Sequence, residues 1–222
     1  MSQEKAPEQV PQQQQQQEKV EEEVKKPATP KMSFIEAIKV RSSIRNYARV
    51  PTAEEIAYIE ECIKALPKKG PFPDSEARFV YIPAELGFMS SYGVVGGPHH
   101  FICGAVKTGG HDLETYGYLF ERLQLECYRI GLGTVWLGGT FTVSPFAPYI
   151  NIKDPQAEFM PAVCPVGLSS GSVGFIAGLI KWSSGATSRK NWSEMFFDGK
   201  YGNAITEEAA GQYAECLEAV RK

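Results

Sequence analysis

The segment KVRSSIRNYARVP, residues 39–51, concentrates side chains that could bind an anion. Arginine presents a planar fork of donors that suits phosphate, and serine adds a short hydroxyl donor. The alternative interpretation is a solvated basic helix end, which the helix dipole favours. The segment holds four cations and two hydroxyls: Lys39, Arg41, Arg45, Arg49, Ser42 and Ser43.

The local excess of cations does not reflect the composition of the whole chain. The 222 residues carry a formal charge of -3, so no chain-wide argument for nucleic-acid binding exists. The five cysteines include no C-x-x-C pair, which favours a reduced, cytoplasmic protein. No apolar run reaches the roughly 18 residues of a membrane span, so we expect no membrane segment.

The N-terminal segment, residues 1–31, differs in composition from the rest of the chain. It contains a glutamine run, several glutamates and lysines, and no aromatic residue. Such a segment cannot bury enough apolar surface to offset the entropy of ordering. We expect a disordered, solvated arm, with partner binding by the glutamine run as the alternative, followed by one folded domain over residues 32–222.

Two capping boxes place the cationic segment between two helices. Ser33 with Glu36 starts one helix, and Thr52 with Glu55 starts another that Pro67 stops. The remaining patterns predict strands at 78–82, 100–106 and within MPAVCPVGL, a long helix over 112–130, a buried strand or extended turn at GTVWLGG, a short helix at NWSEMFF and a final helix over TEEAAGQYAECLEAVR. This mixture of helices and strands indicates an α/β or α+β layered fold.

Three segments resemble the nitroreductase family in the order that this family shows. AIKVRSSIRNY resembles its opening motif, YGYLFERLQLECYRIGLGTVWLGGTF its central helix and glycine loop, and TSRKNWSEMFF its later arginine element. The resemblance covers about residues 33–222 and points to a divergent branch of the family. It implies an α+β fold with a central, mostly antiparallel sheet flanked by helices. It also implies a homodimer with FMN at the subunit interface.

The resemblance assigns roles to individual residues of this chain. The phosphate and ribityl end of FMN would be held by Arg41, Ser42, Ser43 and Arg189. The ring end would be held by Arg45, Gly138 and Gly139, with Arg45 at the pyrimidine edge and the glycines allowing close approach of the backbone.

The implied activity transfers electrons without a side-chain acid, base or nucleophile. FMN would take hydride from NAD(P)H and reduce a small-molecule acceptor such as a nitroaromatic compound or a quinone. The alternative is a flavin-binding or degenerate scaffold without turnover. His99 and His100 are adjacent on an expected strand and point to opposite faces, so we expect no metal there.

The chain also departs from the family pattern. Nitroreductases carry a Pro-Ser-x-x-Asn-x-Gln-Pro-Trp-like segment whose asparagine contacts the flavin ring, and no such segment occurs here. One expectation is that this polypeptide is a C-terminally shortened member of the family. The alternative is that Asp74, Ser75 or backbone groups near Gly138 replace the asparagine.

Overall fold

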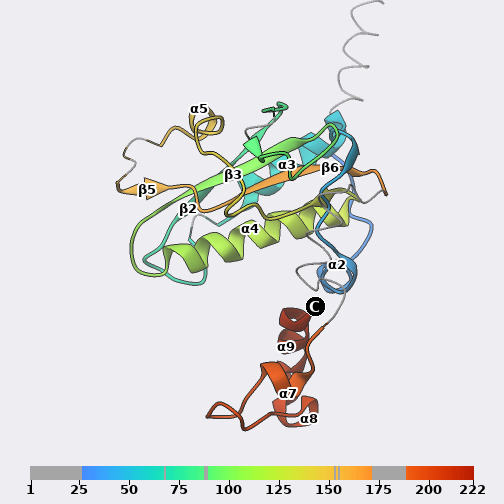
Figure 1. Cartoon of the computed structure of the whole chain (residues 1–222), viewed down its shortest axis with the longest axis vertical. Coiled ribbons are helices and arrows are strands. Elements are labelled where there is room, and N and C mark those ends of the chain that lie inside the picture. Colours follow the sequence, from blue (N-terminus) through green and yellow to red (C-terminus); the bar gives the residue numbers. More distant parts are fainter. Residues whose placement is uncertain (1–26, 68, 88–89, 153, 155, 172–188) are drawn as a thin grey trace, which may run out of the picture.

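The computed structural model describes residues 27–67, 69–87, 90–152, 154, 156–171 and 189–222. A curled antiparallel sheet with helices against it forms the body of the protein (Figure 1). The predicted α+β class with a mostly antiparallel sheet is therefore confirmed. Most of the expected N-terminal arm, residues 1–26, lies outside the described residues.

The sheet has six strands in the path β1-β6-β3-β2, with β4 paired to β6 and β5 paired to β3. Every one of these pairs is antiparallel. The strands are β1 (Tyr47–Arg49), β2 (Ala77–Ile82), β3 (His100–Lys107), β4 (Gly133–Thr134), β5 (Glu158–Phe159) and β6 (Val163–Ser169).

The central strand β3 is buried on both faces because its side chains alternate between two apolar clusters. Ile102 and Val106 belong to one cluster, and Phe101, Cys103 and Ala105 belong to the other. This alternation follows the period of two of a strand. The sheet thus separates two halves of the core, and each half needs its own cover.

Helices α3 (Ala53–Ala65) and α4 (Asp112–Arg129) stand on the first face, and α2 (Phe34–Val40) packs against α4. Both predicted capping boxes are present at α2 and α3. The long α4 supplies the largest share of this half of the core, and α3 contacts both α4 and β2. The other face is covered by α5 (Ala147–Ile150) and its neighbouring loops.

Residues 27–31, the last five of the expected arm, lie against the body. The amide of Ala28 donates to the carbonyl of Glu54 (3.1 Å), and the amide of Lys31 donates to the carbonyl of Arg129 (2.8 Å). The side chain of Ala28 also packs against the first core cluster. This stretch is therefore joined by hydrogen bonds to the ends of α3 and α4.

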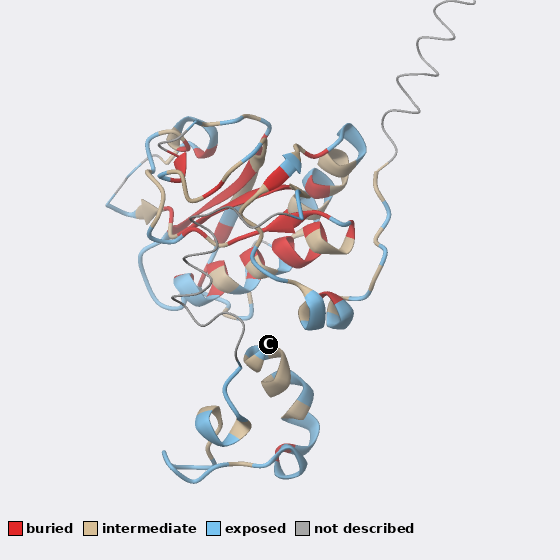
Figure 2. Cartoon of the chain, turned by 45° about the vertical axis from the view of Figure 1, so that its right-hand side comes forward, coloured by how far each residue is buried: buried red, intermediate tan, exposed pale blue. Residues whose placement is uncertain are grey.

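The C-terminal elements form a separate unit that meets the body at α2. It comprises α7 (Trp192–Met195), α8 (Glu207–Ala210), a 3-10 turn (Gly211–Tyr213) and α9 (Ala214–Arg221). Among residues 189–222, all described, only Ala210 is buried. Figure 2 draws this part of the ribbon almost entirely in pale blue and tan. The predicted single final helix is wrong. Gly211 adopts a φ of 52°, a left-handed value that glycine tolerates and an α-helix does not continue through.

Candidate functional site

The cationic segment lies on the surface, between the end of α2 and the start of β1. Helix α2 ends at Arg41, whose extended backbone turns the chain away while its amide still donates to the Ala37 carbonyl (2.8 Å). Ser43 then forms a parallel bridge with Thr134, and the Ile44 amide donates to the Thr134 carbonyl (2.9 Å). The fold therefore seats residues 41–45 beside β4, ninety positions further along the chain.

Tyr47 fixes the other end of this segment. Its hydroxyl donates to the Ile44 carbonyl (2.7 Å) and lies 3.1 Å from the Pro165 carbonyl. Burial raises the pKa of Tyr47 well above its usual value, so the hydroxyl keeps its proton. The segment is also hydrogen-bonded to Gly96. The Gly96 amide donates to the Arg45 carbonyl (2.8 Å), and the Tyr47 amide donates to the Gly96 carbonyl (3.0 Å).

The Arg41 side chain is held from one side by an acidic residue of α4. Its Nε donates to Oε1 of Glu121 at 3.0 Å, and the Arg41 side chain is 23% exposed. Its Nη1 is buried and has no hydrogen-bond partner among the described residues. A guanidinium has five N–H donors, so Arg41 retains an unmet capacity for an acceptor.

Glu121 also holds the strand that leads to the glycine loop. Its Oε2 accepts a hydrogen bond from Nε1 of Trp136 at 2.7 Å. The Trp136 ring meets the Phe120 ring edge-on at 4.6 Å, and Trp136 packs against the first core cluster. One carboxylate therefore joins the end of α2 to the chain two residues before Gly138.

The other predicted residues of this region are exposed. Ser42 and Ser43 are exposed, and so are Gly138 and Gly139. A Cβ at Gly139 would meet nothing within 4 Å, and one at Gly138 only a carbonyl at 3.9 Å. Neither glycine has a positive φ, so neither packing nor backbone conformation requires it. The role of these two glycines in close approach of a ligand to the backbone stays a prediction.

Arg189 belongs to the C-terminal unit. It is exposed and precedes α7. The backbone carbonyl of its neighbour Lys190 accepts a hydrogen bond from Arg221 Nη1 at 3.4 Å. This bond ties the segment to α9, which contacts α2, the helix that ends at Arg41. The participation of Arg189 in the same site as Arg41 stays a prediction.

The proposed replacement of the missing asparagine by Ser75 is wrong. Ser75 is buried, its hydroxyl donates to the Phe72 carbonyl (2.9 Å), and it contacts the Thr115 hydroxyl. Thr115 lies in the first turn of α4, whereas Glu121 lies nearly two turns further along. Asp74 is exposed beside Ser75. Backbone groups near Gly138 are the better placed candidates, because that loop is connected to Arg41 through Glu121.

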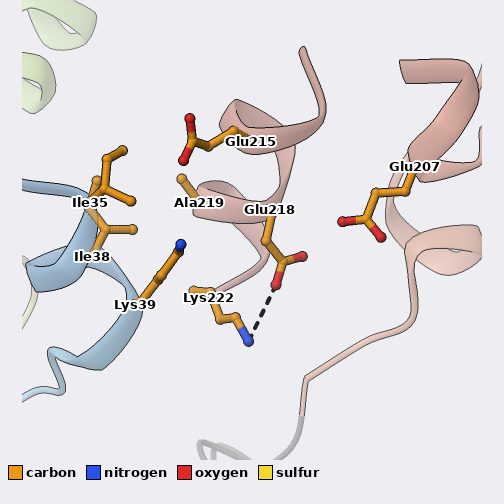
Figure 3. A pocket seen from close by; sticks show the side chains of 8 residues that line it. All are labelled: Ile35, Ile38, Lys39, Glu207, Glu215, Glu218, Ala219 and Lys222. Carbon is orange, nitrogen blue, oxygen red and sulfur yellow. Dashed lines mark ion pairs between the residues drawn. The ribbon is translucent and has the colours of Figure 1, made fainter. Parts of the chain in front are cut away.

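A groove of about 260 Å³ lies between α2 and the C-terminal unit (Figure 3). Three carboxylates and two ammonium groups line it together with apolar side chains: Glu207, Glu215, Glu218, Lys39, Lys222, Ile35, Ile38 and Ala219. The Lys222 ammonium already pairs with Glu218 at 3.3 Å. Three carboxylates against two cations repel a phosphate, so this groove is not the predicted phosphate site.

The cysteine nearest the site is not a nucleophile. Cys164 of β6 is fully buried, and burial raises its thiol pKa to about 12. The thiol form therefore persists at neutral pH. The described residues also contain no group of three histidine, cysteine or acidic side chains placed to hold a metal, and no described helix is long and apolar enough to cross a membrane.

The structure places Arg41, Ser42, Ser43 and the Gly138–Gly139 loop on one α+β domain, and comparison with known families gives its class. A family model described as "Putative TM nitroreductase" matches residues 33–171. This match covers more than half of the chain, so the protein belongs to the nitroreductase family, as the sequence motifs indicated.

Solved structures share this fold. A nitroreductase from Desulfovibrio desulfuricans, solved in complex with FMN, is 22% identical with a TM-score of 0.54 and covers 77% of this chain and 98% of its own. A nitroreductase family protein from Clostridium difficile 630 is 16% identical with a TM-score of 0.52 and covers 76% and 99%. A Thermotoga maritima nitroreductase, 16% identical with a TM-score of 0.50, covers 87% of this chain and 66% of its own. No curated protein matches the chain.

Several features of the site were not predictable from the sequence. Glu121 was not singled out, because its partner Arg41 lies 80 positions away and no local pattern links them. Trp136 packs against the core, and its indole N–H also reaches Glu121, fifteen positions earlier in the chain.

Proposed function

We propose that this protein is an FMN-dependent oxidoreductase that uses NAD(P)H to reduce small-molecule acceptors such as nitroaromatic compounds or quinones. The observation that carries the proposal is Arg41. It precedes the exposed Ser42 and Ser43 in the chain, and its guanidinium keeps a donor without a partner among the described residues. Family membership and the fold shared with an FMN complex point to the same cofactor.

The residues of the phosphate end have the chemistry that FMN requires. A phosphate needs several N–H and O–H donors and a positive charge. Arg41 offers both, and the two serines add hydroxyl donors at the surface. Arg189 would join them from the C-terminal unit. This set binds and orients the cofactor and takes no part in bond making.

The residues of the ring end would control the electronics and the access of the ring. Bound FMN would supply hydride transfer from the nicotinamide and electron transfer to the acceptor. The positive charge of Arg45 would stabilise the electron-rich ring at its pyrimidine edge. The open backbone at Gly138 and Gly139 would let the ring lie flat against the loop.

A second candidate is a flavin-binding protein without turnover. It is favoured by the engagement of Ser75, one of the residues expected to contact the flavin ring, in other hydrogen bonds. In that case the phosphate end would bind FMN while the ring would lack the amide contact. The two candidates share the ligand and differ only in reduction by a nicotinamide.

We further infer a homodimer, and the C-terminal unit supports it. Residues 189–222 bury only Ala210 yet expose Tyr201 (91%), Tyr213 (63%) and Val220 (72%). A unit with so little core gains stability only by covering another surface. The free cysteines, none of them disulfide-bonded among the described residues, support a reducing compartment such as the cytoplasm.

The test begins with the ligand of the purified protein. Mass spectrometry after denaturation should identify FMN, and light scattering should give the mass of a dimer. Anaerobic mixing with NADH and with NADPH should then bleach the flavin absorbance. A protein that binds FMN but is bleached by neither nicotinamide is the scaffold without turnover. A protein that contains no flavin and binds none when it is added refutes the proposal.

A further inference from the structure

Glu121 of α4 makes two contacts that meet at the proposed FMN site. Its Oε1 accepts from Arg41 Nε at 3.0 Å, and its Oε2 accepts from Trp136 Nε1 at 2.7 Å. Each carboxylate oxygen thus serves one donor. The two donors come from chain segments that are nearly one hundred positions apart, the end of α2 and the strand before Gly138.

We propose that Glu121 is a positioning residue for FMN binding, which sets the orientation of Arg41 and the place of the Gly138–Gly139 loop together. The inference rests on the proposed function and assigns no contact between Glu121 and the cofactor. The carboxylate acts through its two partners, one at the phosphate end and one next to the ring end.

The geometry explains why an acidic residue can assist an anion site. Glu121 binds the Nε side of the guanidinium, whereas Nη1 lies on the other side and has no partner among the described residues. A phosphate received at the outer nitrogens would have the guanidinium between itself and the carboxylate. The planar fork of arginine makes this separation rigid, so fixing Nε also aims the outer nitrogens.

The contact with Trp136 is also specific. The indole has a single donor, and its ring is fixed by an edge-on contact with Phe120 at 4.6 Å. Trp136 is half-buried and lies two residues before Gly138, next to Leu137, whose backbone is tied to Val163 by two hydrogen bonds (2.9 and 3.0 Å). Loss of the Glu121 contact would free the Trp136 indole beside this anchor and the Arg41 side chain at once.

The matched control is Glu126, five residues later on the same helix. Its Oε2 accepts from the Tyr58 hydroxyl (2.6 Å) and from Arg129 Nη1 (2.7 Å). It therefore also bridges an aromatic donor and an arginine, but those partners tie residues 31–32 and α3 to α4. A glutamine substitution there changes the same chemistry away from the proposed site.

Two substitutions separate position from charge. Glu121→Gln preserves size, but an amide has one acceptor oxygen and presents an N–H₂ to one of two donors, so one contact is lost. Glu121→Asp preserves the charge but is one methylene too short to reach both partners. If Glu121 only repelled the phosphate, Glu121→Gln would bind FMN more tightly than the wild type.

The experiment titrates FMN into flavin-free wild type, E121Q, E121D and E126Q and records the indole N–H signals by NMR. Trp136 is assigned by the signal missing in Trp136→Phe. We expect E121Q and E121D to weaken FMN binding at least tenfold, E126Q to change it less than threefold, and E121Q to shift the Trp136 signal in the flavin-free protein.

Each of the following results would refute one specific claim. If the wild type binds FMN and both Glu121 variants bind equally well or more tightly, this inference falls and the proposed function stands. If the Trp136 signal does not move in E121Q, the coupling to the glycine loop falls. If the wild type binds no FMN, the proposed function falls and takes the inference with it.

Discussion

Substitution of Arg41 by alanine tests the phosphate end most directly. Removing one partner of a hydrogen-bonded charge pair costs about 2 to 5 kcal/mol when the pair is desolvated. The Arg41 side chain is 23% exposed, so we expect the lower part of this range, about 2 to 3.5 kcal/mol. At about 1.4 kcal/mol per tenfold, the Kd for FMN should rise about 30- to 300-fold.

The same substitution should barely change the stability of the fold. The Arg41–Glu121 pair is partly exposed on both sides, at 23% and 36%, and such pairs contribute about 0.2 to 1 kcal/mol. For a chain of this length 1 kcal/mol corresponds to about 2 to 4 °C in Tm. A thermal shift within about 4 °C beside a large loss of affinity would assign the effect to ligand binding.

The assay is a calorimetric titration of flavin-free protein with FMN and, in parallel, with riboflavin. Riboflavin lacks the phosphate, so Arg41→Ala should leave its affinity within about threefold of the wild type. Arg122→Ala is the matched control, because Arg122 is exposed, adjacent to Glu121 and directed over the Phe34 ring at 5.9 Å. Equal losses for FMN and riboflavin, or an unchanged FMN affinity, would refute the assignment of Arg41 to the phosphate.

Three further predictions address the ring end, the glycines near it and the thiols. Arg45→Ala should lower the midpoint potential of bound FMN by up to ~90 mV, since a cation ~4 Å away contributes roughly 4 kcal/mol; an unchanged potential against a reference dye excludes this role. Gly133→Ala should lower the unfolding free energy by about 1 to 3 kcal/mol, because the new Cβ would lie 2.7 Å from the Ile44 side chain. Gly139→Ala should leave Tm unchanged, because its Cβ would meet nothing within 4 Å, and it should weaken FMN binding. Maleimide should modify the exposed Cys216 first, and Cys216→Ser should remove the fast phase; a fast phase that persists contradicts the burial of the other thiols.

Structural features that depend on residues close together in the chain were predicted well from the sequence. The two capping boxes fixed the starts of α2 and α3 because their hydrogen bonds span only three positions. The single final helix failed at Gly211, where a left-handed backbone interrupts a pattern that otherwise has helical spacing. Arg41 was recognised by its neighbours in the chain, whereas Glu121 could be found only once folding had brought α4 beside the end of α2.

The two bridging carboxylates of α4 show why one arginine of this surface is a binding residue and another is structural. Arg129 is held at two nitrogens and at its face: Nη1 binds Glu126 (2.7 Å), Nε donates to the Met32 carbonyl (2.8 Å), and the guanidinium carbon lies 4.3 Å from the centre of the Phe34 ring. Arg41 makes one side-chain hydrogen bond among the described residues and keeps a buried N–H without an acceptor.

An unpaired buried donor costs about 1 to 3 kcal/mol, and a fold tolerates that cost where a ligand later removes it. The exposures agree with this division, because the side chain of Glu126 is 12% exposed and that of Glu121 is 36% exposed. The Arg129–Glu126 pair is the less exposed of the two, and the Arg41–Glu121 pair is the more exposed. Helix α4 therefore carries two bridging carboxylates: Glu126 holds an arginine that binds the N-terminal segment, and Glu121 holds the arginine that we propose to bind the phosphate.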